Sequence, residues 1–132
     1  MKDKSKLIVL CALMLAILGS YYAIAFIFVA INLLGKELHF AIEHSSMGVY
    51  LHIIFIFFVH ILAVFLFIYS AIGVLKLNNI ARKLAIIITG LNLFTIFTPT
   101  SGWPMLSLKI FIFIISLLTL YFLFNKKVRE KF

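Results

Sequence analysis

Polar side chains inside or beside long apolar runs are the residues of this sequence whose types could do chemistry. The set consists of Glu43, His52, Asn92 and Lys109. If each apolar run is a helix that rises 1.5 Å per residue, His52 and Lys109 lie at similar depth and Asn92 slightly deeper. Because burying such groups in a membrane is costly, they predict a site that binds an anionic headgroup, receives a partner or lines a path for ions or protons. The structural alternative is that Lys109 extends to the surface while His52 and Asn92 form hydrogen bonds between helices.

His60 stands near the middle of the second apolar run. Imidazole is a common axial ligand of haem iron, but the other three runs contain no histidine, so a second ligand would have to come from another chain. We therefore expect His60 to be a buried polar residue that bonds to a neighbouring helix. We expect no bound cofactor.

The stretch between the first two runs carries His39, Glu43 and His44. His39 and Glu43 are four residues apart, which on a helix places both side chains on one face, within reach of one metal ion. A solvated polar loop is the interpretation we favour for these residues. His52 with Glu43 is the pair best suited to acid–base catalysis, but nothing in the sequence fixes the position of the loop. We expect neither a metal site nor catalytic residues.

The composition is that of a membrane protein. Hydrophobic residues make up 65% of the 132 residues and charged residues 12%, whereas soluble proteins average about 45–50% and about 25%. The net charge of +8 does not predict nucleic-acid binding, because the basic residues stand at the ends of apolar runs, where they orient a membrane protein and meet anionic lipid. Cys11 is the one cysteine, which excludes an internal disulfide and a CxxC redox pair.

Four apolar runs predict membrane-spanning helices, because a span needs about 20 apolar residues. The runs cover about 7–34, 49–75, 82–98 and 105–124. They leave loops at 35–48 and 99–104 on one side of the membrane and a short basic elbow at 76–83 on the other. The predicted fold is all-α: a single integral membrane domain over residues 1–132 in which four helices form a bundle.

The distribution of basic residues predicts the orientation. Ten of the 12 lysines and arginines precede the first run, lie in the elbow or follow the last run, and only Lys36 and Lys109 belong to the other side. Since cytoplasmic segments carry the excess of Lys and Arg, both termini are expected in the cytoplasm and the protein in the inner (plasma) membrane. Ala23-Ile24-Ala25 has the form of a signal-peptide cleavage site, but the apolar run continues to Leu34, so we expect no cleavage.

Small residues follow one face of the first run, within about 100° of arc at 100° per residue. They are Ala12, Ala16, Gly19, Ser20 and Ala23. Small side chains let membrane helices approach closely, so this face is predicted to pack against another helix, in the same chain or in another. The second run has an aromatic face that we expect to contact lipid. It is formed by Phe55, Phe58, Phe65 and Tyr69.

Two segments carry a resemblance to a known group of proteins. The elbow segment Gly73 to Ala85 (GVLKLNNIARKLA) and the ending Tyr121 to Phe132 (YFLFNKKVREKF) resemble those of small, uncharacterised four-span proteins of the bacterial inner membrane. The resemblance implies a bacterial inner-membrane location and brings no function with it.

These features favour a non-enzymatic membrane protein that acts through helix–helix packing. It would be an accessory or regulatory subunit, or a protective protein of the kind that confers immunity to bacteriocins. The expected partners are the lipid bilayer and either further copies of the chain, as a homo-oligomer, or a larger membrane complex. One alternative is a small oligomeric transporter or channel that uses the polar set. The first run contains no acidic residue, however, and so lacks the group with which small multidrug transporters bind a cationic substrate. A second alternative is an enzyme that acts on lipid or quinone.

Overall fold

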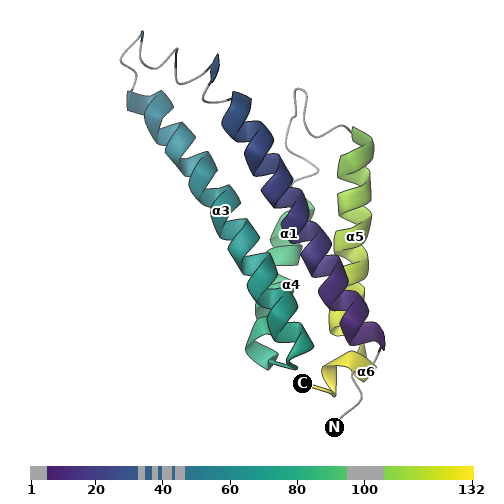
Figure 1. Cartoon of the computed structure of the whole chain (residues 1–132). Coiled ribbons are helices and arrows are strands. Elements are labelled where there is room, and N and C mark those ends of the chain that lie inside the picture. The colour runs from purple at the N-terminus through teal and green to yellow at the C-terminus, as the bar shows by residue number, and fades with distance from the viewer. Residues whose placement is uncertain (1–5, 33–34, 37–38, 40–42, 44–46, 95–105) are drawn as a thin grey trace.

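The computed structural model describes residues 6–32, 35–36, 39, 43, 47–94 and 106–132. This part of the chain is helical and contains no strand. The helices are α1 (Lys6–Asn32), α3 (Met47–Leu75), α4 (Asn79–Leu93), α5 (Leu106–Phe124) and α6 (Lys126–Arg129). Figure 1 shows the first four side by side, with α6 as a short turn beneath α5.

Among the described residues, three helices are long and apolar enough to cross a membrane. The segments that meet this standard are Lys6–Asn32, Tyr50–Leu75 and Ser107–Phe124. The fourth, α4, has 15 described residues, which at 1.5 Å per residue is about 22 Å and short of a hydrocarbon core of about 30 Å. The third predicted span continues to residue 98, and its last four residues lie outside the described part of the chain.

The turn between α3 and α4 is tighter than the predicted elbow. The backbone amide of Asn78 donates to the Gly73 carbonyl (2.8 Å) and that of Leu77 to the Val74 carbonyl (3.0 Å). This is the Schellman arrangement that ends helices, and it places Leu77 in the left-handed region with φ 57°. The side chain of Asn78 then accepts from the amides of Ile80 (2.9 Å) and Ala81 (3.3 Å) and so starts α4. Residues 79–83, expected in the elbow, therefore belong to α4.

Each long helix contacts the next one along the chain, and the last long helix also contacts the first. α1 packs against α3 and α5, α3 packs against α4, and α4 packs against α5. The start of α1, the turn at 76–78 and α6 lie at one end of the molecule, which we call the base (Figure 1).

Most of the buried side chains are apolar. Large side chains with 0–2% exposure come from α1, α3, α5 and α6; they are Ile8, Leu15, Leu18, Phe67, Val74, Leu123 and Val128. Cys11 is buried among them as a free thiol. The core thus joins the first helix to the last.

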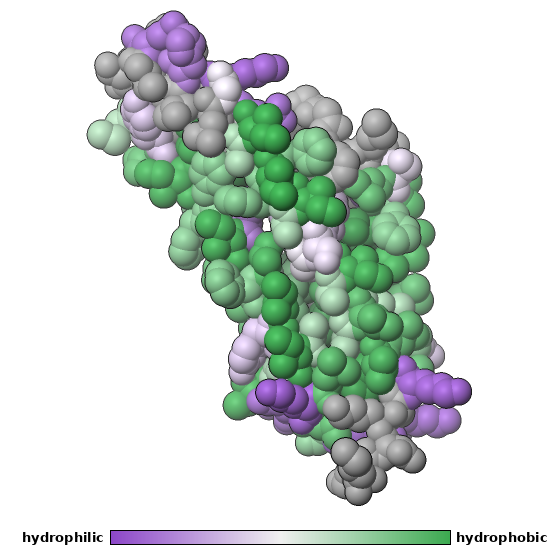
Figure 2. Space-filling model, in the orientation of Figure 1, coloured by the Kyte–Doolittle hydropathy of each residue, from purple (hydrophilic) through white to green (hydrophobic). Residues whose placement is uncertain are grey.

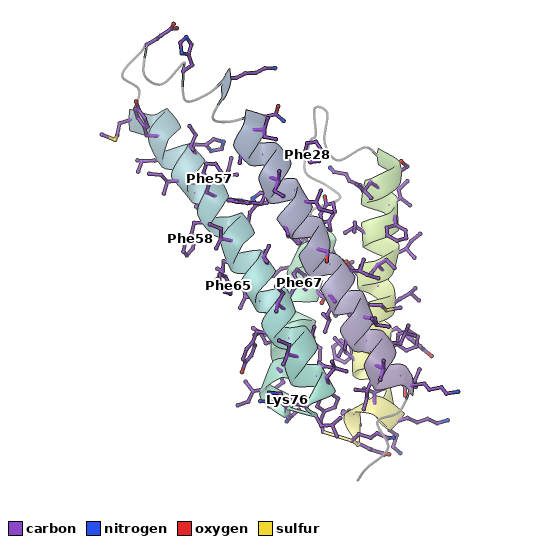
Figure 3. The ribbon with its side chains drawn as sticks, in the orientation of Figure 1. Phe28, Phe57, Phe58, Phe65, Phe67 and Lys76 are labelled. Carbon is purple, nitrogen blue, oxygen red and sulfur yellow. The ribbon has the colours of Figure 1, made fainter. Side chains whose placement is uncertain are left out.

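The outer surface is also apolar, which a soluble protein would avoid. The aromatic face expected on α3 is exposed: Phe55, Phe58, Phe65 and Tyr69 have exposures of 51–68%. In Figure 3, Phe58 and Phe65 point away from α1, and Phe67 lies between the two helices. Figure 2 shows an apolar surface over the middle of the molecule with polar residues toward its two ends. Together with the three long apolar helices, this surface indicates a membrane protein.

Candidate functional site

A chain of hydrogen bonds links three helices in the interior. The Tyr22 hydroxyl of α1 donates to Oδ1 of Asn92 in α4. Nδ2 of Asn92 donates to Oγ of Ser116 in α5 (2.7 Å), and the Ser116 hydroxyl donates to the Ile112 carbonyl (2.8 Å). Asn92 is 4% exposed and Ser116 is 0% exposed. Each donor in this chain has an acceptor, so the buried amide and hydroxyls are satisfied.

Aromatic neighbours hold the ring of Tyr22 in the position from which its hydroxyl bonds to Asn92. The ring stacks on Phe67 of α3, with centroids 5.6 Å apart and planes at 19°. It also meets the edges of Tyr21 (5.4 Å) and His60 (6.1 Å). Tyr22 thereby connects α1 to α3 through ring contacts and to α4 and α5 through hydrogen bonds. The arrangement can fix the rotation of all four helices about their axes.

His60 is half-buried on α3 and bonds within its own helix. Its Nδ1 lies 2.9 Å from the Ile56 carbonyl oxygen, which can only accept, so the ring carries a proton on Nδ1. The sequence predicted a bond to a neighbouring helix; the structure gives a bond to the preceding turn and the ring contact with Tyr22. No group of three or more His, Cys, Asp or Glu side chains is placed to hold a metal ion within the described residues.

Of the polar set predicted from depth, two residues are exposed and two are buried. Glu43 pairs with His39, with Oε1 and Nε2 3.0 Å apart and both side chains exposed. His52 is exposed on α3. Lys109 is 8% exposed on α5, and Asn92 is buried in the bonded chain with Tyr22 and Ser116. His44, the third residue of the weak metal pattern, lies outside the described residues.

The small residues of α1 divide between a helix contact and an open groove. Gly19 is buried close to α3, where a Cβ would lie 3.2 Å from Cβ of Phe67, and Ala12 is 4% exposed. Ala16 and Ser20 are exposed and Ala23 is half-buried. All five line a groove of about 410 Å³, whose other wall is formed by α3 residues Val64, Ile68, Ala71, Ile72 and Leu75. The Ser20 hydroxyl donates to the Ala16 carbonyl (2.9 Å), so the groove presents almost no free polarity.

Arg82, which the sequence suggested only as an orienting charge, holds the base together. It is 9% exposed, and its Nη1 donates to the Leu123 carbonyl in the last turn of α5 (3.0 Å). Its Nε donates to Oδ1 of Asn79 (3.3 Å), and its guanidinium lies 5.8 Å from the centroid of the Phe132 ring. Arg82 thus satisfies a carbonyl that has no partner within its own helix and joins α4 to the end of the chain.

Two further hydroxyls are buried without a hydrogen-bond partner. Ser70 of α3 and Thr89 of α4 are both 0% exposed, and neither Oγ of Ser70 nor Oγ1 of Thr89 has an acceptor or donor in range. Thr119, by contrast, donates to the Ile115 carbonyl (2.7 Å).

Sequence reasoning named Asn92 but missed its partners Tyr22 and Ser116. A polar residue in each of three apolar runs was the available signal. Pairing them required the rotation of each helix, since Tyr22 and Asn92 are 70 residues apart.

Compared with known protein families, curated proteins and solved structures, the chain shows no match.

Proposed function

We propose that this chain is a multi-pass protein of the bacterial inner membrane whose four helices all cross the bilayer as a bundle, with both termini in the cytoplasm. In this proposal it is a non-enzymatic accessory, regulatory or protective (immunity-like) protein. It acts by receiving a transmembrane helix, from a larger complex or from a second copy, in the groove between α1 and α3.

The open groove is the observation that carries this proposal. Lipid tails are as apolar as leucine, so membrane helices associate where small residues permit close backbone approach. Ala16, Ser20 and Ala23 provide such a floor on α1, and the bulkier Ile68 and Ile72 provide a wall on α3. A ridge of side chains on another helix fits a groove of this kind.

The alternative function, transport of a solute by this protein, has weaker support. The transport alternative needs Glu43, His52, Asn92 and Lys109 to act together. Glu43 is paired with His39 and exposed, whereas Asn92 is bonded to Tyr22 and Ser116.

Filling the groove is expected to weaken association without unfolding the chain. In Ala16→Leu the new side chain occupies the exposed floor of the groove, and a partner helix must move away or lose contacts. Steric overpacking costs about 1–3 kcal/mol, which corresponds to a loss of affinity of about 5- to 150-fold. The measurement is native mass spectrometry of complexes extracted from membranes in mild detergent, with helicity checked by circular dichroism.

Gly90→Leu is the matched control, because a Cβ at Gly90 meets nothing within 4 Å. This variant should keep the partner. A wild-type chain extracted as a monomer with lipid alone, or an Ala16→Leu variant that keeps its partner, would argue against the groove as the functional surface. The mass of the partner distinguishes a second copy from another protein.

A further inference from the structure

A small cavity at the base lies between the first turn of α1 and the segment that follows α5. It has a volume of about 320 Å³ and is lined by Leu7, Lys127, Glu130 and Lys131. Leu7 belongs to the first turn of α1, and the other three belong to α6 and the residues that follow it. The cavity therefore lies at the base, with one apolar and three charged residues in its lining.

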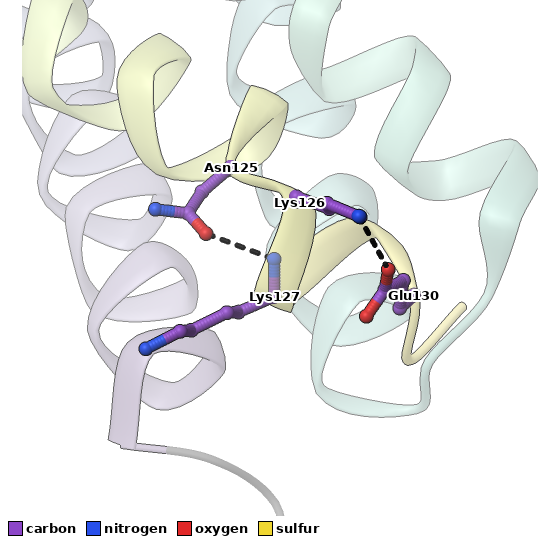
Figure 4. Close-up of polar contacts among 4 residues, drawn as sticks. All are labelled: Asn125, Lys126, Lys127 and Glu130. Atoms are coloured by element: carbon purple, nitrogen blue, oxygen red, sulfur yellow. Dashed lines mark hydrogen bonds and ion pairs between the residues drawn. The ribbon is translucent and has the colours of Figure 1, made fainter.

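The segment that carries the lysines is held firmly against the rest of the molecule. Oδ1 of Asn125 accepts from the Lys127 amide (2.9 Å), which turns the chain at the end of α5 (Figure 4). Val128 is 0% exposed, and the Phe132 ring lies over Arg82. The positions of Lys127 and Lys131 beside Leu7 thus follow from packing.

The charges around the cavity are unequally matched. Glu130 pairs with Lys126 (Figure 4). Oε1 of Glu130 lies 3.8 Å from Nζ of Lys126. Lys127 and Lys131 are four residues apart and form no ion pair with an acidic residue of the described part of the chain. The other acidic side chain described there is Glu43, which pairs with His39. Two lysines therefore face the cavity with one carboxylate that is already engaged.

We propose that this cavity is a binding site for the phosphate of an anionic phospholipid in the leaflet that borders the base. Two ammonium groups supply the charge that a phosphate attracts, and each basic residue near a membrane surface adds to the binding of anionic lipid. Leu7 supplies the apolar wall along which the acyl chain leaves the headgroup. One lipid would contact the first helix and the last segment together. This proposal does not depend on the groove between α1 and α3.

The test is native mass spectrometry of the full-length chain in detergent, titrated with dioleoyl phosphatidylglycerol or with dioleoyl phosphatidylcholine. We expect one phosphatidylglycerol to bind several-fold more tightly than phosphatidylcholine. Replacing Lys127→Gln and Lys131→Gln together should weaken phosphatidylglycerol binding by about fivefold per lysine. The matched control, Lys76→Gln with Lys83→Gln, removes the same charge from exposed positions in the turn and in α4 and should change binding less than twofold.

Glu130→Gln gives a change of opposite sign that loss of folding cannot imitate. It removes the carboxylate from the cavity wall and frees Lys126, so phosphatidylglycerol should bind about two- to fivefold more tightly. Three results would overturn the proposal. They are an equal loss of phosphatidylglycerol affinity in the two double-lysine variants, weaker phosphatidylglycerol binding in Glu130→Gln, and equal binding of the two lipids by the wild-type chain. Displacement of the lipid by millimolar inorganic phosphate would also overturn it, since the site would then bind free phosphate.

Discussion

Gly73→Ala is expected to lower the free energy of unfolding by about 1–3 kcal/mol, the cost of overpacking a filled site. A Cβ at position 73 would lie 2.2 Å from Cβ of Ala81, a distance that real side chains do not adopt. Because Cβ of Ala81 is fixed to its backbone, α3 and α4 must move apart to relieve the clash. That movement would also disturb the bond from the Asn78 amide to the Gly73 carbonyl (2.8 Å). Unfolding of purified protein in mixed micelles, followed by circular dichroism, measures the effect.

Gly90→Ala is the control for this prediction. The substitution is the same, but a Cβ at Gly90 meets nothing within 4 Å. Alanine is about 0.5–1 kcal/mol more favourable than glycine inside a helix, so Gly90→Ala should be neutral or stabilising. Two variants of equal stability would mean that the turn at 76–78 does not bring α3 and α4 as close as described.

Asn92→Ala is expected to be the second most damaging change, because one side chain bonds to both α1 and α5. Its removal leaves the Tyr22 hydroxyl without its acceptor and Oγ of Ser116 without its donor. A buried group that loses its partner costs about 1–3 kcal/mol, more than the average of about 0.6 kcal/mol for an interhelical hydrogen bond in a membrane protein. The same unfolding measurement applies.

A double-mutant cycle separates the hydrogen bond from the loss of packing. Tyr22→Phe removes the hydroxyl but keeps the ring stacked on Phe67, so alone it should cost less than Asn92→Ala. Combined with Asn92→Ala it should add little further, with a coupling energy of about 0.5 kcal/mol or more. Strictly additive effects would show that Tyr22 and Asn92 do not interact.

The positions of the helices were largely predictable because they depend on local features. The second run was predicted at 49–75 and the helix covers Met47–Leu75; the fourth was predicted at 105–124 and the helix covers Leu106–Phe124. Polarity changes abruptly at these ends, so composition marks them. The start of α4 was placed three residues late, because the side chain of Asn78 caps a helix that begins at Asn79.

The candidate site was less predictable because it depends on helix rotation. Depth, counted from the rise per residue, grouped Asn92 with Lys109 and His52. It says nothing about which way a helix turns or tilts, and Asn92 in fact faces Tyr22 and Ser116. The role of Arg82 was hidden for a similar reason, since its acceptor is a backbone carbonyl 41 residues away that any sequence would supply.

The groove was partly visible in the sequence. The small face of α1 was found from its spacing, but spacing cannot tell which small residues are covered by a neighbouring helix. Phe67 covers Gly19, whereas Ala16 and Ser20 remain exposed. The width of the groove depends on how far α3 leans from α1, which is a property of the whole packed structure.

Cysteine labelling tests most directly whether all four helices cross the membrane with both termini inside. In a Cys11→Ala background, we would introduce Lys36→Cys, Lys83→Cys and Lys131→Cys, each at an exposed position. A membrane-impermeant maleimide should label Lys36→Cys in intact spheroplasts, and the other two only after permeabilisation. If α4 does not cross, α5 must leave the cytoplasm, and Lys131→Cys would be labelled in intact spheroplasts while Lys83→Cys is not. That result would contradict the four-span topology.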